Sequence, residues 1–301
     1  MSIPTIRRRE RIFDTLLFLL AVFGAWGATA SFRSGGAWNA LGVAFLLGLM
    51  LLASGVFIEP RFLRIVRYRE PLVKHPGTWV RFVFLSDFHA GGFRNREWYE
   101  RLSVEAQALD PDVLVLGGDF VVDAADAVRD IEPLTRVTAH HGRYFFLGNH
   151  DFLDDPRRIR RTLREWGIAD LTNAHVSIRK DGHELQITGL DDHYYGRPIV
   201  PPFRPSVTLP HVTIAHEPDG IRDLEAGQTD LYLAGHTHGG QIRLPFLGSL
   251  APIPSTLGRL ADRGRKNVRG IPLIVTQGCG EADLRARLFC PAEIMVVEVG
   301  I

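Results

Sequence analysis

The stretch that decides the fold is Gly148-Asn149-His150-Asp151, which directly follows the apolar run Tyr144 to Leu147. The run predicts a strand, and Gly and Asn favour a sharp turn after it. The turn sets an amide, an imidazole and a carboxylate side by side. Taken alone it is weak evidence for a site, because a His next to an Asp is often only a surface pair. Its meaning depends on whether similar turns follow other strands.

Four other polar groups also follow apolar runs. They are Asp87-Phe88-His89, Gly118-Asp119, His216 and Gly235-His236-Thr237-His238-Gly239-Gly240. From Val80 onward, short apolar runs predict strands at 80–85, 113–116 and 144–147, with helices expected at 97–109, largely over 124–140, and from Asp155-Pro156. From about Ala174 strands dominate, at 176–178, 185–187, 212–215, 231–233, 273–275 and 294–299. Two loops are expected among them, a Pro- and aromatic-rich one at 193–210 and a second at 241–266. The alternation predicts an α/β protein with sheets packed in layers.

Bulk composition excludes several classes of protein. The chain has 301 residues, 46% of them hydrophobic, and a formal net charge of +1. That charge balance gives no general attraction to nucleic acid, so no nucleic-acid partner is expected. The two cysteines, Cys279 and Cys290, are too few for a disulfide framework. We expect reduced, buried thiols, with a single disulfide between them as the alternative.

Two uncharged segments near the N-terminus, 15–32 and 34–58, are each about as long as a bilayer span of roughly 20 residues. Only Arg33 separates them, which favours a transmembrane helical hairpin over two buried helices of a soluble protein. We therefore divide the chain into a membrane-anchoring segment at 1–60, a basic juxtamembrane linker at 61–78 and a catalytic domain at 79–301.

Basic residues flank both outer ends of the predicted hairpin. They are Arg7, Arg8, Arg9 and Arg11 before it, and Arg61, Arg64, Arg67, Arg69 and Lys74 after it. The positive-inside bias predicts an inner-membrane protein whose catalytic domain faces the cytoplasm, with the lipid bilayer as a partner. A signal-peptidase site at Ala28-Thr29-Ala30 is an alternative, and the second span would still keep its basic flank inside. The sequence indicates no obligate protein partner.

The strand-end residues suggest a metal centre, because strand ends of an α/β sheet converge on one edge. The candidate ligands are Asp87, His89, Asp119, Asn149, His216, His236 and His238. Carboxylates, imidazoles and an amide without a thiolate suit divalent manganese, with iron or zinc as alternatives. Seven ligands exceed what one tetrahedral ion needs but suit two ions that share a carboxylate. Two such ions act on phosphoryl transfer by clamping the attacking and leaving oxygens.

As an ordered set, these blocks resemble the calcineurin-like metallophosphoesterases. The matching blocks are Asp87-Phe88-His89, Gly118-Asp119, Gly148-Asn149-His150-Asp151, Ala215-His216-Glu217-Pro218-Asp219 and Gly235-His236-Thr237-His238-Gly239-Gly240-Gln241. The resemblance implies a four-layer αββα sandwich. It also implies that Asp87, His89 and His238 hold one ion, that Asn149, His216 and His236 hold the other, and that Asp119 bridges them.

The resemblance further implies that His150 is the general acid or a transition-state stabiliser. Many members of the family carry a carboxylate three residues after the bridging aspartate, which orients this histidine. Here that position is Val122, and the next residue is Asp123. The carboxylate partner of His150 is therefore either Asp123 or Asp151.

The membrane segments and the block after His236 resemble a membrane-associated subgroup that includes the UDP-2,3-diacylglucosamine pyrophosphatases of lipid A synthesis. The expected substrate is a phosphodiester or pyrophosphate, such as a lipid-linked nucleotide whose acyl chain lies on Leu244, Phe246 and Leu247. Arg94, Arg157 and Arg161 are candidates to bind its phosphates, since arginine forks suit phosphate oxygens. The alternatives are a broad phosphomonoesterase or phosphoprotein phosphatase, and a non-catalytic metal-binding membrane scaffold.

Overall fold

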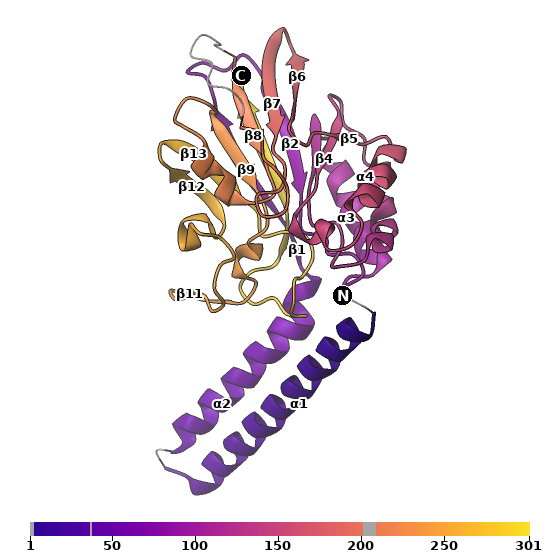
Figure 1. Ribbon diagram of the computed structural model, residues 1–301. Coiled ribbons are helices and arrows are strands. Elements are labelled where there is room, and N and C mark those ends of the chain that lie inside the picture. Colours follow the sequence, from indigo (N-terminus) through magenta and orange to yellow (C-terminus); the bar gives the residue numbers. More distant parts are fainter. Residues whose placement is uncertain (1–2, 37, 201–208) are drawn as a thin grey trace.

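The computed structural model describes residues 3–36, 38–200 and 209–301. Two six-stranded sheets face each other in the main domain (Figure 1). The first has the order β1 (Leu63–Pro71), β14 (Ala292–Gly300), β2 (Trp79–Leu85), β3 (Val113–Gly117), β4 (Arg143–Phe146) and β5 (Ala169–Asp170). All its neighbouring strands are parallel except β14 and β2. Consequently β2, β3 and β4 all end at the same edge.

The second sheet has the order β12 (Gly264–Val268), β13 (Ile271–Val275), β9 (Leu231–Ala234), β8 (His211–Ile214), β7 (His183–Gly189) and β6 (Ala174–Lys180). Its four central strands are parallel, and an antiparallel strand closes each side. A small hairpin of β10 (Arg243–Leu244) and β11 (Gly248–Ser249) lies apart from both sheets.

The inner faces of the two sheets form one apolar core, to which both contribute fully buried side chains such as Phe82, Phe84, Ile214 and Leu233. On the outer face of the first sheet lie α3 (Arg96–Ala108), α4 (Pro156–Glu165) and the 3₁₀ turns of η3 (Ala125–Arg136). On the outer face of the second lie the short 3₁₀ helices η5 (Pro218–Asp223) and η7 (Gly258–Ala261). The predicted four-layer sandwich is confirmed, although one outer layer is made of short turns.

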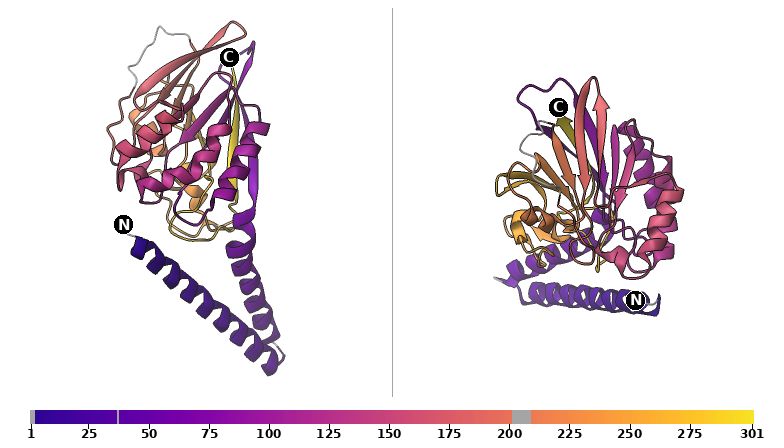
Figure 2. Two further views of the ribbon diagram at one scale, coloured as in Figure 1. Left: turned by 90° about the vertical axis from the view of Figure 1, so that its right-hand side faces the viewer. Right: turned by 45° about the horizontal axis from the view of Figure 1, so that its top comes forward.

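The N-terminal hairpin is also confirmed. Helix α1 (Ile3–Ser34) packs along α2 (Trp38–Ala53), which continues through a π-helical turn, η1 (Ser54–Ile58), and a 3₁₀ turn, η2 (Glu59–Arg61) (Figure 2). Glycines allow the helices to approach closely: a Cβ at Gly27 would lie 2.8 Å from the Phe45 ring. Asp14–Ser34 and Trp38–Arg61 are long and apolar enough to cross a membrane. Whether they do so stays a prediction.

The segment 61–78, expected as a linker, instead contains strand β1. Leu63–Pro71 pairs in parallel with Ala292–Gly300 and forms the edge of the first sheet. Its arginines Arg64, Arg67 and Arg69 are exposed, which suits an edge strand because charged side chains discourage further strand pairing. The basic composition thus belongs to a structural element of the main domain.

Two further expectations need correction. The segment 124–140, expected to be largely α-helix, forms 3₁₀ turns over Ala125–Arg136, and Pro133 lies inside it, where it cannot donate the hydrogen bond of an α-helix. The segment 241–266, expected as a loop, contains β10, β11, η7 and the start of β12. Within the expected loop at 193–210, residues 201–208 lie outside the described residues.

Both cysteines are free and buried, as predicted. Burial raises the pKa of Cys279 to about 12 and also raises that of Cys290. Because only the thiolate reacts, neither thiol should react with Ellman's reagent at pH 8 in the native protein, whereas both should react in guanidinium chloride. Rapid labelling of a thiol in the native protein would contradict this assignment.

Candidate dinuclear metal centre

The seven candidate ligands come together at the carboxyl ends of both sheets. Asp87 and His89 follow β2, Asp119 follows β3, Asn149 follows β4, His216 follows β8, and His236 and His238 follow β9. All are buried except Asn149, which is half-buried. Asp87 and His238, which are 151 positions apart in the sequence, thus share one site because the parallel strands of both sheets end at the same edge.

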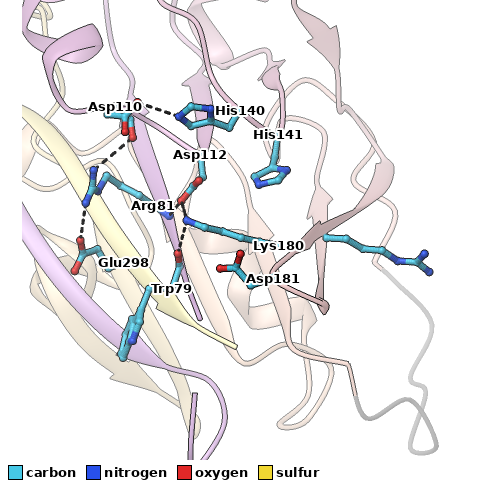
Figure 3. A pocket seen from close by; sticks show the side chains of 10 residues that line it. Trp79, Arg81, Asp110, Asp112, His140, His141, Lys180, Asp181 and Glu298 are labelled. Atoms are coloured by element: carbon cyan, nitrogen blue, oxygen red, sulfur yellow. Dashed lines mark hydrogen bonds and ion pairs between the residues drawn. The ribbon is translucent and has the colours of Figure 1, made fainter. Parts of the chain in front are cut away.

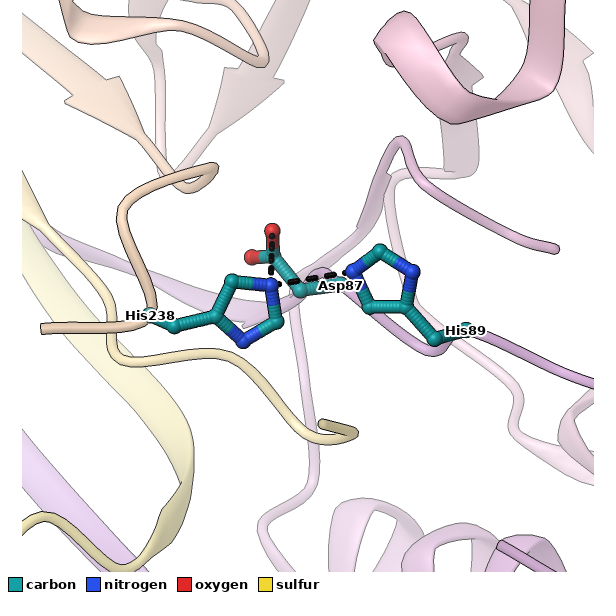
Figure 4. Close-up of side chains that lie close together, drawn as sticks. All are labelled: Asp87, His89 and His238. Atoms are coloured by element: carbon teal, nitrogen blue, oxygen red, sulfur yellow. Dashed lines mark hydrogen bonds and ion pairs between the residues drawn. The ribbon is translucent and has the colours of Figure 1, made fainter. Parts of the chain in front are cut away.

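Two groups of ligand atoms have the spacing of metal sites. Asp87, His89 and His238 form one group, and Asp119, His216 and His236 form the other, with the ligand atoms of each group within 4.8 Å of one another. In the first group, His89 Nε2 lies 2.9 Å from His238 Nε2, which in turn lies 3.5 Å from Asp87 Oδ1 (Figure 4). The first group has the members that the family resemblance implied. The second contains Asp119 where the resemblance implied Asn149.

Asp119 lies between the two groups. Its Oδ2 is 3.1 Å from His216 Nε2 in the second group and 3.6 Å from His89 Nε2 in the first. The side chain therefore lies within reach of both groups, and its bridging role stays a prediction. Its other oxygen, Oδ1, accepts a hydrogen bond from the backbone N–H of His150 at 2.9 Å.

Two hydrogen bonds across the sheets fix the ligands. The backbone N–H of His236 donates to Asp87 Oδ1 at 3.0 Å, and His216 Nδ1–H donates to the carbonyl oxygen of Gly117 at 2.7 Å. The second bond leaves His216 Nε2 facing Asp119. Imidazole ligands in metal sites are commonly oriented by such a bond on the other nitrogen. Burial would lower the pKa of His216, but the Asp119 carboxylate raises it well above its usual value.

Five of the ligand residues have left-handed backbone conformations. The φ angles of Asp87, His89, Asp119, His236 and His238 lie between 47° and 70°. A residue with a Cβ pays roughly 1–2 kcal/mol for this conformation, and such residues concentrate at functional sites. The strain turns each side chain inward at the end of its strand.

The donor set fits divalent cations. Asn149 Oδ1 is buried and has no hydrogen-bond partner among the described residues, so it lacks compensation for its lost hydration. Burial lowers the pKa of His89 to about 3 and that of His236 to about 4, so both imidazoles are neutral at pH 7, the state that binds metal. Burial would raise the pKa of Asp119, but His216 and His150 hold it well below its usual value.

Asp87, His89 and His238 would hold one ion, Asn149, His216 and His236 the other, and Asp119 both. When bound, two divalent ions supply Lewis acidity toward a phosphoryl group and its attacking water. The protein supplies a closed set of oriented ligands, and His150 lies beside them. Its ring meets that of His89 edge-on, with centroids 4.6 Å apart.

The hydrogen-bond partner of the His150 ring is a backbone carbonyl. Nδ1–H donates to Val122 O at 2.7 Å, which fixes the tautomer and leaves Nε2 available to carry a proton for a leaving oxygen. Val122 occupies the position where many family members carry a carboxylate, and its backbone oxygen here takes the orienting contact.

Asp151 has a different place from the one expected. Its Oδ1 accepts hydrogen bonds from the backbone N–H groups of Phe120 (2.8 Å) and Val121 (3.2 Å), and its Oδ2 accepts from Gly148 at 2.9 Å. The fully buried carboxylate therefore ties the loop after β3 to the turn after β4. Burial would lower the pKa of His150, but the negative charge of Asp119, the hydrogen bond to Val122 and the negative charge of Asp151 together raise it. Asp123 is buried nearby in the loop after β3.

The predicted substrate arginines lie in different surroundings. Arg94 is paired with Glu281 at 2.5 Å and stacks over Trp98 at 3.6 Å, so its charge is already engaged within the protein. Arg157 and Arg161 are exposed on α4, and neither forms an ion pair with any residue that the structure describes. Contact of all three with substrate stays a prediction.

Sequence reasoning missed two residues at the site. The ring of Tyr194 lies 5.4 Å from that of His236, and the side chain is 46% exposed, so it borders the centre. Arg287 is completely buried and donates to the carbonyl oxygens of Gln277 and Cys290 at 3.0 and 2.9 Å, close to His238. The aromatic loop at 193–210 offered a signal for Tyr194, whereas an isolated arginine offered none.

A cleft of about 580 Å³ lies at the opposite end of the sheets, where β2 begins (Figure 3). Its charges pair with one another: Lys180 with Asp112 at 2.6 Å, Arg81 with Glu298 at 3.3 Å, and His140 with Asp110 at 3.0 Å. These pairs connect the strands and leave little net charge for a ligand. We therefore place the functional site at the other end.

Comparisons with known proteins identify the family. Residues 80–240 match the family described as calcineurin-like phosphoesterase. "Phosphodiesterase YaeI" of Escherichia coli (strain K12) is 28% identical over 254 residues, which cover 81% of this chain and 90% of that protein. "Uncharacterized metallophosphoesterase YkuE" of Bacillus subtilis (strain 168) is 27% identical, covering 93% and 95% of the two chains. "Transmembrane protein with metallophosphoesterase domain" of Danio rerio is 27% identical, covering 77% and 59%.

The fold and the site define a metal-dependent hydrolase of phosphoester bonds. The family match covers more than half of the sequence, and the chain belongs to the calcineurin-like phosphoesterases. The metal-binding motifs of the sequence all lie within or directly at the edge of the matched region.

We predict that the manganese-loaded protein binds two ions per chain, because the ligands form two groups and Asp119, a member of the second, also lies near His89 of the first. Asp119→Asn should reduce metal content below that of the parent protein, measured by inductively coupled plasma mass spectrometry. His175→Ala is the matched control, since His175 is exposed on β6. One ion per chain in the fully loaded parent would contradict a dinuclear centre.

Separate alanine substitutions of His150 and Asp151 should have different effects, the first on turnover and the second on the free energy of unfolding. His150→Ala should lower turnover of a soluble aryl phosphodiester by about 10²–10⁴-fold, because the proton donor is lost. Asp151→Ala leaves three buried N–H groups without their acceptor, at about 1–3 kcal/mol each, so the free energy of unfolding should fall by about 3 kcal/mol or more. Denaturant titration in detergent measures the second effect. An Asp151→Ala protein of normal stability would contradict the structural role.

Proposed function

We propose that the protein is a membrane-anchored phosphodiesterase that hydrolyses a phosphodiester or pyrophosphate bond in a lipid-linked substrate. UDP-2,3-diacylglucosamine, which would yield UMP and a lipid monophosphate, is the first candidate. We propose two manganese ions as the metal pair, with iron or zinc as alternatives, because the ligands are carboxylates, imidazoles and an amide.

The observation that carries this proposal is the position of the metal centre at the end of the domain that joins α2 (Figure 1). Strand β2 runs antiparallel to β14, so its ligand-bearing end lies beside the start of β14. The loop just before β14 contacts the end of the hairpin: Arg287 N–H donates to Gly55 O at 2.8 Å, and Phe289 N–H donates to Glu59 Oε2 at 2.6 Å. A bilayer around α2 would therefore lie close to the metals.

The surface of the hairpin supports membrane insertion. Large apolar side chains point outward along both helices, including Phe18, Trp26, Leu47 and Met50, each more than half exposed. Such a surface is unfavourable in water and suits acyl chains. We further propose the inner membrane, with the catalytic domain in the cytoplasm, because arginines flank the two uncharged segments at both outer ends.

An anchored enzyme gains most from a substrate in the same bilayer, since both are confined to one surface and the effective concentration rises. The border of the site also suits a nucleotide headgroup. Tyr194 is half-exposed beside His236, and Tyr195 is exposed and stacked on Phe152 with centroids 6.3 Å apart. Exposed aromatic faces can stack on a planar base.

The test is manganese-dependent release of UMP from UDP-2,3-diacylglucosamine by the full chain purified in detergent. We expect release by the parent protein and a loss of about 10²–10⁴-fold in His150→Ala. The matched control is His175→Ala, which should keep full activity. A soluble aryl phosphodiester and an aryl phosphomonoester are assayed in parallel.

The parallel assays distinguish the alternatives. If the protein hydrolyses the soluble diester but no lipid-linked substrate, the proposed lipid substrate is wrong and the phosphodiesterase activity stands. Turnover of the monoester alone would favour the phosphomonoesterase. Full metal loading with no turnover of any ester would favour a metal-binding scaffold.

A further inference from the structure

The tip of the β10–β11 hairpin is a strongly exposed apolar turn. Phe246 is fully exposed and has a left-handed backbone conformation, with φ of 66°, and Leu247 is 61% exposed. A phenylalanine rarely adopts positive φ, and here the conformation leaves the ring wholly outside the domain. Neither side chain contributes to any of the three apolar cores. Folding of the domain alone gives no reason for this turn.

The turn belongs to a larger apolar surface. A cavity of about 280 Å³ separates Phe246 from Phe289, which is also exposed, and Leu244 and Pro245 line it as well. Leu250 and Leu260 are more than half exposed in the neighbouring segments. We call Phe246, Leu247, Leu250, Leu260 and Phe289 the apolar rim.

The apolar rim is continuous with the end of the membrane hairpin. Glu59, in the last turn after α2, accepts hydrogen bonds from the backbone N–H groups of Phe289 and Cys290. Phe57, Ile58 and Phe62, on either side of that turn, are each at least half exposed. In Figure 1, β11 lies at the same end of the domain as α1 and α2. The surface that would meet a bilayer around α2 therefore extends to Phe246.

Positive charge accompanies the rim. Arg263 lines the cavity, and its guanidinium donates to Gln277 Oε1 at 2.7 Å and to Phe289 O at 3.3 Å, both neutral acceptors. Arg259 has no carboxylate partner within the described part of the chain and lies against Gly248 of the hairpin. Two cations without an acidic partner beside exposed aromatic and aliphatic groups match an anionic lipid surface, which offers phosphates above acyl chains.

We propose that the apolar rim is a second membrane attachment, in which Phe246 and Leu247 enter the boundary between headgroups and acyl chains of an anionic bilayer while Arg259 and Arg263 contact lipid phosphates. This rests on the proposed membrane insertion of the hairpin. The attachment reaches the metal centre directly: Arg243, at the base of β10, donates to the carbonyl oxygen of Gly239, the residue after the ligand His238. Two attachments would fix the tilt of the domain and hold the site against the bilayer.

The test uses the full chain with Phe246→Cys, labelled with an environment-sensitive fluorophore and reconstituted into vesicles of phosphatidylcholine and phosphatidylglycerol. The native thiols are buried, so the parent protein serves as the unlabelled control. Arg179→Cys is the matched control, because Arg179 is exposed at the opposite end of the domain. We expect a blue-shifted emission that spin-labelled lipids quench at position 246, and a water-like, unquenched emission at position 179.

Adding Arg259→Gln and Arg263→Gln to the labelled protein should reduce the quenching at position 246 in the anionic vesicles. Equal, water-like emission at both positions in protein that floats with the vesicles would overturn the rim and leave the membrane anchor intact. Failure to float would instead overturn the anchor. A label at position 246 that is shielded in detergent and insensitive to spin-labelled lipids would point to a second copy of the chain and overturn lipid docking.

Discussion

The metal centre depends on the contact between the two sheets at Asp87. This residue follows β2 in the first sheet, and its carboxylate accepts the backbone N–H of His236, which follows β9 in the second. The approach is so close that a Cβ at Gly235 would lie 2.2 Å from Ser86 Oγ, and a Cβ at Gly148 would lie 2.7 Å from His216 Cδ2. The glycines before the histidine and asparagine motifs are therefore required by space. Without them the two halves of the ligand set could not meet.

The same convergence creates an electrostatic cost that the protein offsets only in part. Asp87, Asp119 and Asp151 are all buried within one region, and burial raises the pKa of Asp87 to about 6 and that of Asp151 to about 7. Backbone N–H groups compensate Asp151, but Asn149 Oδ1 has no such partner among the described residues. Buried like charges with incomplete hydrogen bonding are unfavourable unless a cation binds them. The buried carboxylates thus destabilise the metal-free protein, and the same negative charges favour the binding of cations.

The sequence predicted the site better than it predicted the structure around it. Each ligand follows an apolar strand, so a side-chain pattern marks its position. The structure places all seven at converging strand ends and gathers six of them, all but Asn149, into two clusters. The orienting contact of His150 is a backbone carbonyl of Val122, which no residue type could indicate. Asp151 was one of two candidate carboxylate partners of His150, but its oxygens accept hydrogen bonds from three backbone N–H groups. The residue types therefore predicted which side chains gather at the site. They did not predict which atoms form hydrogen bonds there.

Strand β1 was missed for a related reason, and it changes how the anchor should be understood. Its arginines dominated the composition, whereas its pairing partner, β14, lies more than 200 residues away and is invisible to local patterns. Because β1 begins two residues after η2, the membrane hairpin continues directly into the first sheet. Glu59 and Gly55 then bind the loop at 287–290, in which buried Arg287 lies beside His238. The end of the second helix is therefore part of the scaffold that supports a metal ligand.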